Sequence, residues 1–519
     1  MTANSDQTLS DWLHAQALDN PDAAAIVDGD GTISYGQLSQ AVSRLCSGLA
    51  GLGIGPGDVV GVQLPNVRSF IIAFLAVTAR GGIFQTLHMP YRRAELEGLL
   101  EDSSAKAVIV TNTATDSRAQ DVLNVRASLP NLAHVIVSGP AIDGCTSLVD
   151  LMATSSDPSD QMATTINDTY LLLYTSGTTG KPKGVPHVYR SFLNNALLSS
   201  HELQVRAGDR ILSLAPMTHL YGLFTLHLAL ASGATTVLVP AFNPATLFDD
   251  LSAAQATHIF AAPAHFAPFV AQDLLHSNHL AATRLLCLSG ATVPQSLAKA
   301  VDDKMDNGVV IQLWGMSELQ AGTFGRPDDP EEKRLTTAGS AVPKTEIRVV
   351  ADDGRVLDPD QEGALQVRGP SVFGGYLNRR DETERAFAAE NWFATGDLAV
   401  IDPDGFMSIT GRTKEIINRG GVKFNPVEIE EVLSTLPAIL QCAIVPIPDP
   451  DLGERGCLCV QLAKGAKLTL AEVTEVLNRS GLAKYKWPEH LVIVDDMPVT
   501  PTRKIMRGTL VERVLAANS

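Results

Sequence analysis

The chain has 519 residues, of which 45% are hydrophobic and 19% are charged, and its formal net charge is −17 at pH 7. A chain of this length exceeds what one hydrophobic core usually organises, so at least two domains are expected. The negative charge argues against nonspecific binding to nucleic acids or to anionic membranes, whose phosphates would repel it.

The sequence shows no targeting or membrane-spanning segment. Residues 1–6 lack the basic and apolar stretches of a secretory signal, and the terminal Ala-Asn-Ser is not a peroxisomal address. The apolar run from Phe70 to Ala79 is too short to span a bilayer and predicts a buried helix. The six cysteines have no zinc-ligand spacing and are few for a disulfide scaffold, which favours reduced thiols. Together these features predict a cytoplasmic protein without a membrane partner.

Taken in order along the chain, the apolar patterns predict alternating helices and strands. Leu9–Leu18 has helical spacing and ends before Asn20-Pro21, and residues 24–35 predict a hairpin. Strand-like apolar runs then alternate with longer helical stretches; these runs lie at residues 59–64, 108–110, 134–137, 211–214 and 235–239. The alternation is typical of mostly parallel sheets covered by helices, and so of the α/β class.

The character of the sequence changes between residues 345 and 411. Short apolar segments are separated there by Asp352-Asp-Gly354, Glu362-Gly363 and Asp402-Pro-Asp-Gly405, which predicts a β-rich subdomain. A polar stretch follows Gly411, and a compact α/β module extends to the end. A boundary near residue 413 would divide the chain into a large N-terminal domain, residues 1–413, and a small C-terminal domain, residues 414–519.

The segment Tyr174-Thr-Ser-Gly-Thr-Thr-Gly-Lys-Pro-Lys-Gly184 combines hydroxyl side chains, glycines and lysines directly after an apolar run. Glycines let backbone N–H groups approach an anion, hydroxyls add donors, and lysines add positive charge. This combination fits a polyphosphate, although the spacing is not that of the Walker loop. A flexible Ser/Thr/Gly linker would share the composition, but it would not need two lysines around a proline.

Two further segments each carry one carboxylate. Leu313-Trp-Gly-Met-Ser-Glu318 follows a strand-like run, and one carboxylate suffices for Mg²⁺, which shares its oxygen ligands with phosphates. By itself this segment could equally be a helix N-terminus with an incidental glutamate. Phe393-Ala-Thr-Gly-Asp397 predicts a tight turn whose carboxylate can accept both hydroxyls of a ribose, although Thr-Gly-Asp is a common turn sequence.

Two basic segments follow towards the C-terminus: Gly411-Arg-Thr-Lys-Glu-Ile-Ile-Asn-Arg-Gly-Gly421 and Pro498-Val-Thr-Pro-Thr-Arg-Lys504. An ammonium placed between two anions offsets their like-charge repulsion. A lone lysine near a C-terminus, such as Lys504, is more often a surface charge, so only the whole motif gives it a further role.

In this order, these segments resemble the motifs of the adenylate-forming (AMP-binding) superfamily, and the resemblance extends from about residue 9 to about residue 510. Within that superfamily, the chain is most similar to the acyl-CoA synthetase, or carboxylate–CoA ligase, branch. The resemblance implies a large domain that binds AMP and the acyl group, a small mobile α/β C-terminal domain, and an active site between them. Two further segments fit the same pattern, Ala215–Leu223 and Leu288–Thr292.

The resemblance implies roles for individual residues in chemistry and nucleotide binding. Lys504, Glu318 and Ser317 would be catalytic, with Ser317 donating to the α-phosphate, and Glu318 and Thr175 would bind the metal. The residues expected to contact ATP or AMP are Thr175, Ser176, Gly177, Thr178, Thr179, Gly180, Lys181, Lys183, Gly290, Ala291, Trp314, Gly315, Asp397 and Arg412.

The resemblance also implies an acyl site, a hinge and a thiol-binding loop. The residues expected at the acyl site are His219, Gly290, Gly315 and Met316. Lys414 would be the hinge of the C-terminal domain, and Gly420 and Gly421 the loop that contacts CoA. His219 could instead be a core histidine, and Lys414 a solvated linker residue.

The chain departs from the family pattern at a few positions. Trp314 and Ser317 stand where the family most often has Tyr and Thr, and both changes preserve the chemistry. Arg503 precedes Lys504 where the family usually has Gly, which bears on the local turn. Ala364 replaces a usual Glu and receives no role.

These expectations describe a carboxylate–CoA ligase that uses ATP, Mg²⁺ and CoA. It would form an acyl-adenylate with release of pyrophosphate, and then an acyl-CoA thioester with release of AMP. The alternative is a stand-alone adenylation enzyme that loads a carrier-protein thiol; no carrier domain follows residue 519, but a partner in trans is open. A luciferase-like oxygenase has no specific support, and a non-catalytic nucleotide-binding regulator would not need Lys504, Glu318 and Asp397 together.

The expected partner is a small carboxylic acid. Because no cationic partner for a second carboxylate is evident near His219, a monocarboxylate, aliphatic or aromatic, is favoured. The sequence leaves both a monomer and a homodimer open, and neither nucleic acid nor membrane is expected as a partner.

Overall fold

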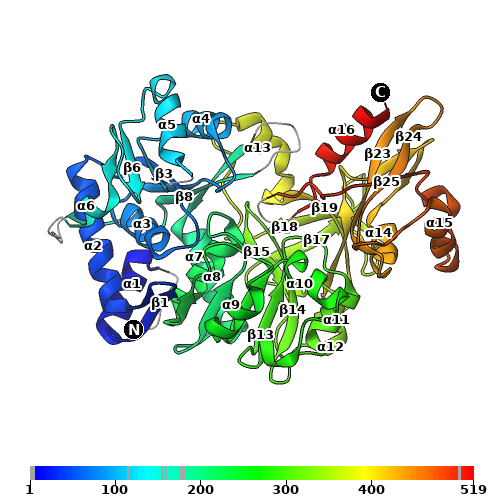
Figure 1. Ribbon diagram of the computed structural model, residues 1–519, viewed down its shortest axis with the longest axis horizontal. Coiled ribbons are helices and arrows are strands. Elements are labelled where there is room, and N and C mark those ends of the chain that lie inside the picture. The colour runs from blue at the N-terminus through cyan, green and yellow to red at the C-terminus, as the bar shows by residue number, and fades with distance from the viewer. Residues whose placement is uncertain are drawn as a thin grey trace.

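The computed structural model describes residues 6–113, 116–153, 157, 160–175, 182–500 and 504–518. The N-terminal and central segments form a large body, and the orange-to-red C-terminal segments form a smaller lobe at one end of the long axis (Figure 1). The fold class is α/β, as the alternating apolar pattern predicts. None of the described helices is both long and apolar enough to cross a bilayer.

The first large sheet places side by side the two ends of the predicted polyphosphate-binding segment, residues 174–184, called the polyphosphate motif below. It has the strand order β7-β6-β5-β3-β4-β8-β9 and is parallel except between β8 and β9. Thr175 at the end of β8 pairs with Lys183 at the start of β9. The strands are β3 (Val59–Gln63), β4 (Ile83–Thr86), β5 (Ala107–Thr111), β6 (His134–Ser138), β7 (Thr146–Ser147), β8 (Thr169–Thr175) and β9 (Lys183–Val188).

The second large sheet carries the segment that ends in Glu318. Its order is β16-β15-β14-β13-β12-β10-β11-β1-β2, with parallel pairing from β14 to β1 and antiparallel pairs at both ends. The strands are β1 (Ala24–Asp28), β2 (Gly31–Ser34), β10 (Arg210–Ser213), β11 (Thr235–Val237), β12 (His258–Ala261), β13 (Leu285–Leu288), β14 (Val309–Met316), β15 (Gln320–Phe324) and β16 (Ser340–Ala341). The hairpin predicted over residues 24–35 is β1 and β2.

The predicted β-rich section is an antiparallel sheet in the order β17-β18-β19-β20. Its strands are β17 (Glu346–Val350), β18 (Gly363–Arg368), β19 (Phe393–Ile401) and β20 (Met407–Arg412). The tight turn predicted at Asp397 is wrong, because Asp397 lies inside β19. Gly396, with φ of 78°, and a register shift after Leu398 distort the strand locally without ending it.

The predicted buried helix over Phe70–Ala79 is α3, which packs against α1 and α2. Its residues from Phe70 onwards are buried all round, which explains why they show no polar face. The α-helices are α1 (Leu9–Asp19), α2 (Tyr35–Gly51), α3 (Arg68–Ala79), α4 (Arg93–Asp102), α5 (Arg118–Val125), α6 (Leu148–Met152), α7 (Tyr189–Glu202), α8 (Leu220–Ser232), α9 (Leu247–Ala254), α10 (Pro263–Ala271), α11 (Gln295–Asp302), α12 (Glu331–Thr336), α13 (Arg380–Ala386), α14 (Val427–Ser434), α15 (Leu470–Arg479) and α16 (Arg507–Asn518).

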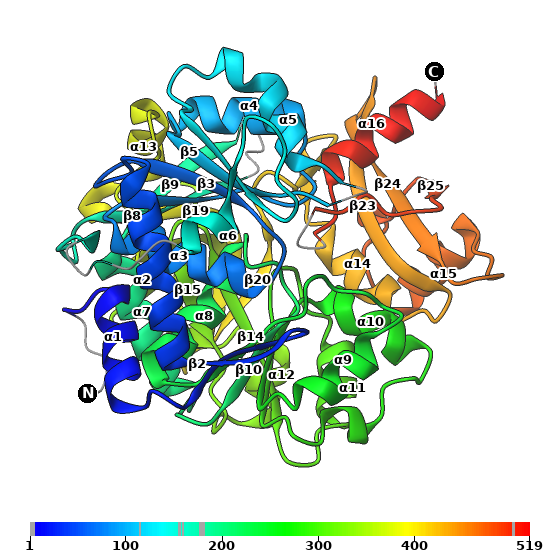
Figure 2. The ribbon, with the colours of Figure 1, turned by 60° about the vertical axis from the view of Figure 1, so that its left-hand side comes forward.

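The C-terminal lobe has its own sheet and its own hydrophobic cores. The sheet order is β22-β21-β24-β23, and β25 pairs with β24. Its strands are β21 (Ile417–Arg419), β22 (Val422–Phe424), β23 (Ile439–Asp449), β24 (Gly453–Leu462) and β25 (His490–Ile493). Both core clusters draw their buried residues from within residues 417–514. The lobe stands beside the large body, where β23 approaches α10 (Figure 2).

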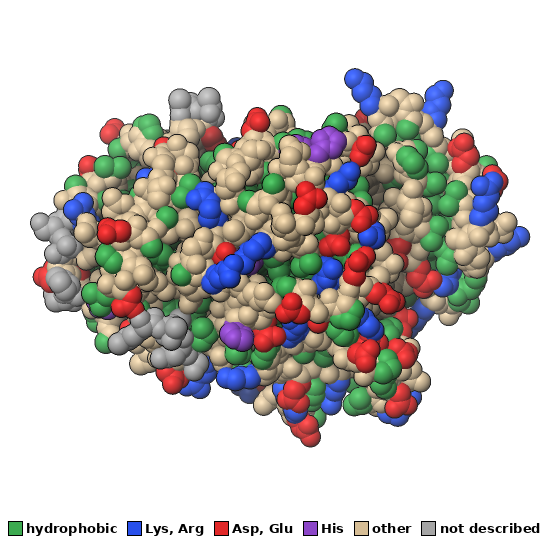
Figure 3. All heavy atoms as spheres, turned by 90° about the horizontal axis from the view of Figure 1, so that it is seen from below, with side chains coloured by type: hydrophobic (Ala, Val, Ile, Leu, Met, Phe, Trp, Pro, Cys, Tyr) green, Lys and Arg blue, Asp and Glu red, His purple; other side chains and the backbone are tan. Residues whose placement is uncertain are grey.

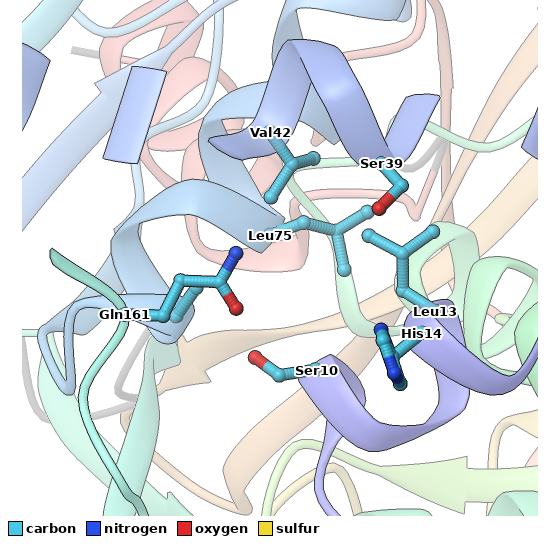
Figure 4. A pocket seen from close by; sticks show the side chains of 8 residues that line it. Ser10, Leu13, His14, Ser39, Val42, Leu75 and Gln161 are labelled. Carbon is cyan, nitrogen blue, oxygen red and sulfur yellow. The ribbon is translucent and has the colours of Figure 1, made fainter. Parts of the chain in front are cut away.

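Neither the surface charge nor the cavity among the N-terminal helices defines the functional site. Figure 3 shows acidic and basic side chains mixed over the face seen from below. A cavity of about 30 Å³, large enough for roughly one water molecule, lies among α1, α2 and α3 (Figure 4). It is lined by Ser10, Leu13, His14, Ser39, Val42, Leu75, Ala79 and Gln161, none of which is a predicted site residue.

Candidate active site

Asp397 is the centre of a hydrogen-bonded group that joins the second large sheet to the β-rich sheet. Trp314 on β14 donates from Nε1 to Oδ2 of Asp397 at 2.9 Å, and Arg412 donates from Nε to Oδ1 at 2.7 Å. Asp397 and Arg412 are direct partners in the register of β19 and β20, which explains their contact. Trp314 and Asp397 are buried. The group is therefore a fixed carboxylate with lone pairs left for further donors.

Glu318 lies in the turn between β14 and β15, and the residue is 5% exposed. Burial raises the pKa of Glu318, and a hydrogen bond from Tyr376 to Oε1, at 3.0 Å, opposes this shift. The turn needs glycine at position 315, because a Cβ there would lie 2.1 Å from the carbonyl oxygen of Gln320. The close approach of β14 and β15 beside Glu318 therefore depends on this glycine.

Lys504, in the C-terminal lobe, lies close enough to this group for its charges to be felt. The charges of Arg412, Asp397, Glu415 and Glu318 act on its ammonium. The pKa of Lys504 is lowered, mainly by desolvation of the ammonium and next by the positive charge of Arg412. The residue itself remains exposed to solvent. An ammonium that is partly desolvated but still accessible suits a group that must meet an anionic ligand.

The segment that carries Lys504 is anchored by an arginine three residues further along. Arg507 binds Glu430 in a bidentate ion pair, with both N–O distances at 2.7 Å. It also pairs with Glu415 at 3.1 Å, directly after the predicted hinge residue Lys414. The backbone N–H of Lys504 donates to Oγ1 of Thr500 at 3.1 Å. These contacts fix the base of the lysine side chain to the lobe and to the segment that follows Lys414.

His219 is the N-cap residue of α8, where its Nδ1 accepts from the backbone N–H of Tyr221 at 3.2 Å. It stacks on His88, with ring centroids 6.2 Å apart, and the charge of Lys504 acts on it. Burial lowers the pKa of His219 to about 3 and that of His88 to about 4. The two imidazoles are therefore neutral at physiological pH, and together they present an uncharged aromatic surface near Lys504.

The central part of the polyphosphate motif and Arg503 lie outside the described residues. These predicted residues are Ser176, Gly177, Thr178, Thr179, Gly180 and Lys181. Of the flanking residues, Thr175 is half-buried, and Lys183 pairs with Glu382 at 2.5 Å and lies 4.7 Å from the ring centre of Tyr376. The described part of the motif therefore lies close to Glu318 through their shared neighbour Tyr376.

The remaining predicted residues lie around this centre or on the C-terminal lobe. Gly290 follows β13 with φ of 87°, Ala291 is exposed, and Met316 packs partly against the largest core. Lys414 is exposed at the junction of β20 and the lobe. Gly420 and Gly421 form the two-residue turn of the β21–β22 hairpin.

Both glycines of this hairpin turn have positive φ, 59° at Gly420 and 87° at Gly421. A two-residue hairpin loop with positive φ at both positions is a turn that strongly favours Gly-Gly. The N–H of Gly420 donates to the carbonyl of Leu452 at 2.7 Å, which ties the turn to the lobe. Gly421 has nothing within 4 Å of a Cβ position, so it is open to a ligand.

A single-carboxylate metal site fits the residues at this centre. Within the described ranges, no group of three or more His, Cys, Asp or Glu side chains could enclose a metal ion. Mg²⁺ needs no such cage, since it usually takes one or two carboxylates together with phosphate oxygens and water. Glu318, buried and held at Oε1 by Tyr376, matches that requirement.

Two residues of this region were not predicted from the sequence. Tyr376 precedes α13 and His88 follows β4, and neither belongs to a motif with a recognisable spacing. The pair Gly374-Gly375, a common turn sequence, precedes Tyr376 directly but says nothing of its contact with Glu318. His88 lies 130 residues from Thr218, its hydrogen-bond partner at 2.9 Å, so only the fold reveals its place.

Comparison with known proteins identifies the class. The family model described as AMP-binding enzyme matches residues 13–377, and that of the AMP-binding enzyme C-terminal domain matches residues 428–504. The chain belongs to this family of AMP-binding enzymes.

Its relatives include ligases with different acceptors. The medium-chain fatty-acid–CoA ligase of Escherichia coli (strain K12) is 32% identical over 97% of this chain and 90% of the relative. The salicyl-AMP ligase / salicyl-S-ArCP synthetase of Mycobacterium tuberculosis (strain ATCC 25618 / H37Rv) is also 32% identical, over 98% of this chain and 91% of the relative. The solved anthranilate CoA ligase in complex with anthranoyl-AMP has a TM-score of 0.90 and 25% identity, covering 100% of this chain and 99% of that chain.

Proposed function

We propose that the protein is an ATP- and Mg²⁺-dependent carboxylate–CoA ligase that acts through an acyl-adenylate. The observation that carries the proposal is electrostatic: the charges of Asp397, Arg412 and Glu318, in the large body, act on the ammonium of Lys504 in the C-terminal lobe. Adenylation of an acid requires a cation near the reacting anions, a carboxylate for a metal and an acceptor for the nucleotide. Lys504, Glu318 and Asp397 supply these three groups.

In the first half-reaction, an oxygen of the substrate carboxylate attacks the α-phosphorus of ATP. A new C(=O)–O–P bond forms, and the bond from the α-phosphorus to the bridging oxygen breaks, so pyrophosphate leaves with the electron pair. The ammonium of Lys504 lies between the two anions and offsets their repulsion. Ser317 donates to the α-phosphate, and Asp397 accepts from the ribose hydroxyls beside Trp314. The phosphate motif from Thr175 to Lys183 holds the polyphosphate.

Glu318 and Thr175 are the residues that would hold Mg²⁺ together with phosphate oxygens. The ion, when bound, neutralises charge on the polyphosphate and on the departing pyrophosphate. The protein's own contribution is to orient the carboxylate of Glu318 while it is buried. The hydrogen bond from Tyr376 to Oε1 supports this orientation and opposes the effect of burial on the pKa of Glu318.

In the second half-reaction, the sulfur of CoA attacks the carbonyl carbon of the acyl-adenylate. A C–S bond forms, the C–O bond to AMP breaks, and the thiol proton is released. We assign the hinge to Lys414, with residues 1–413 and 414–519 as the two domains. Rotation there would withdraw Lys504 and bring Gly420 and Gly421 to the site, so that one site serves both transition states. The exposed, ligand-accessible turn at Gly421 supports this assignment.

The acyl site proposed around His219, Gly290, Gly315 and Met316 favours an uncharged acyl group. The supporting observation is that His219 and His88 are both held neutral by burial. A second carboxylate on the substrate would find no counterion in them. A monocarboxylate is therefore the expected substrate, aliphatic or aromatic.

The test has two parts. Carboxylate-dependent exchange of pyrophosphate into ATP tests adenylation, with a panel of aliphatic and aromatic monocarboxylates and matched dicarboxylates. Thioester formation with free CoA then tests the acceptor. Exchange without any carboxylate dependence would contradict the proposed function at its first step.

A carrier-protein thiol is the alternative acceptor. The observation that favours it is that the salicyl-S-ArCP synthetase is as similar to this chain, at 32% identity, as the fatty-acid–CoA ligase. Acyl transfer to a phosphopantetheinylated carrier protein, with no thioester from free CoA, would establish this alternative.

A further inference from the structure

Tyr376 contacts two residues of the proposed ATP site, Glu318 and Lys183, from a third segment of the chain. Its hydroxyl donates to Oε1 of Glu318 at 3.0 Å. The Nζ atom of Lys183 lies 4.7 Å from the centre of its ring, which is a cation–π contact. Glu318 belongs to the β14–β15 turn and Lys183 to the start of β9, so Tyr376 connects two segments of separate sheets.

The surroundings of Tyr376 hold it in place. Its backbone N–H donates to Oγ1 of Thr383, within α13, at 2.9 Å. Its ring packs edge-on against Phe373, with centroids 4.8 Å apart, and the N–H of Phe373 donates to the backbone carbonyl of Glu318 at 2.8 Å. The Tyr376 loop therefore holds both the side chain and the backbone of Glu318.

Lys183 is restrained from the same side. Glu382, on the first turn of α13, pairs with its Nζ atom at 2.5 Å. The ammonium thus rests between a carboxylate and an aromatic ring, both supplied by the segment around residues 376–382. A polyphosphate that binds Lys183 must compete with Glu382, whereas the ring of Tyr376 can remain in contact with the ammonium.

We propose that Tyr376 is a positioning residue that sets the placement of Glu318 relative to Lys183, and thereby the affinity for the magnesium complex of ATP. The proposal rests on the proposed function, since it needs Glu318 at the metal and Lys183 at the phosphates. The hydroxyl orients one carboxylate oxygen and leaves the other for the ion. The ring limits where the ammonium can lie. Groups of this kind commonly govern metal affinity without contacting the metal.

The two contacts can be separated by substitution. Tyr376→Phe removes the hydroxyl and keeps the ring over Lys183, and Tyr376→Leu removes both. Tyr35→Phe is the matched control: it deletes another buried hydroxyl, which donates to the carbonyl of Ala234 at 2.6 Å, on the side of the molecule near α8.

The direct readout is equilibrium binding of ATP to the full chain by calorimetry, with Mg²⁺ and with EDTA. Tyr376→Phe should weaken Mg²⁺-dependent ATP binding by about 10- to 100-fold, as outer contacts of metal ligands typically do. Its binding of ATP in EDTA should stay within twofold of the wild type. Tyr376→Leu should weaken binding under both conditions, and Tyr35→Phe under neither. The KM for the carboxylate should not change in any variant.

A double-mutant cycle with Glu318→Gln identifies the route of the effect. If Tyr376 acts through Glu318, adding Tyr376→Phe to Glu318→Gln should produce no further loss of Mg²⁺-dependent affinity. Losses that multiply fully would overturn the proposal, as would an unchanged magnesium dependence in Tyr376→Phe. Should Tyr376→Leu fail to fold, Tyr376→Phe alone carries the test. A wild-type chain that shows no Mg²⁺-dependent ATP binding would instead contradict the proposed function.

Discussion

The indole Nε1 of Trp314 and the carboxylate Oδ2 of Asp397 lie 2.9 Å apart, in a hydrogen bond between two buried residues of different sheets. Arg412 holds the other oxygen of the same carboxylate at 2.7 Å. Asp397 is thus fixed from both sides before any ligand binds. Fixed donors and acceptors contribute most where they need no rearrangement during the reaction.

Asp397→Asn should raise the KM for ATP at least tenfold. An amide has one oxygen and one NH₂ group, so either Trp314 or Arg412 would face a donor instead of an acceptor, and fewer lone pairs would remain for the ribose hydroxyls. A hydrogen bond lost between the ribose and a charged acceptor costs about 1.5–3 kcal/mol, and about 1.4 kcal/mol corresponds to a factor of ten in affinity. Steady-state kinetics measure this, and the KM for the carboxylate should stay constant.

Trp314→Phe is the milder companion of this variant, because it keeps an aromatic ring and the full carboxylate. It should raise the KM for ATP less than Asp397→Asn does. An Asp397→Asn enzyme whose KM for ATP lies within twofold of the wild type would rule out the ribose-binding role.

Gly421→Ala should slow thioester formation and leave pyrophosphate exchange unchanged. At φ of 87°, an alanine strains the β21–β22 turn by about 1–2 kcal/mol, and its methyl group would project into the space assigned to CoA. A control must separate the effect of this backbone strain from the effect of the position of the methyl group. Gly465→Ala provides it, since Gly465 has φ of 81° and equally open surroundings. Equal loss of the thioester step in both variants would show that strain, and not position, is the cause.

The stability of the fold should fall on acidification from pH 7 to pH 5. Burial lowers the pKa of His187 and of His227 to about 3 in the folded protein, against about 6.5 when unfolded. Between these values the unfolded chain binds protons that the folded chain does not, so stability is lost as pH falls below about 6.5. At pH 5, the loss is up to about 2 kcal/mol for each histidine, from 1.36 kcal/mol per pH unit.

Denaturation midpoints in urea at pH 5, 6 and 7 measure this dependence. His227→Gln should lower stability at pH 7 but reduce the change between pH 7 and pH 5. His201→Gln, at a side chain that is 90% exposed, should keep the wild-type dependence. If His227→Gln kept the full dependence as well, burial of its imidazole would not be the cause.

Local patterns predicted much of the fold because apolar periodicity reports burial directly. The helix α1, the hairpin β1–β2, the buried α3 and the β-rich sheet all follow from it. The position of Asp397 inside a strand did not follow from this pattern, because Thr-Gly-Asp has the composition of a turn. Pairing with Arg412 on the neighbouring strand overrides that local preference.

The contacts between residues of the candidate site were harder to predict from the sequence than the motifs themselves. Lys504, Glu318, Asp397 and Arg412 stand in segments with distinct composition, and the charges of these residues act on one another in the fold. Tyr376 stands 58 residues from Glu318, and nothing in the spacing links the two. Such partners depend on how the sheets meet, which a local pattern does not contain.

The most direct measurement compares both half-reactions in Lys504→Ala, with Lys464→Ala, an exposed lysine of the same lobe, as control. Loss of a preorganised charge at a transition state typically costs a factor of about 10²–10³ or more. Pyrophosphate exchange should fall by at least that factor, while thioester formation from synthetic acyl-adenylate and CoA should stay within a few-fold of the wild type. An equal loss of both half-reactions in Lys504→Ala would contradict the account.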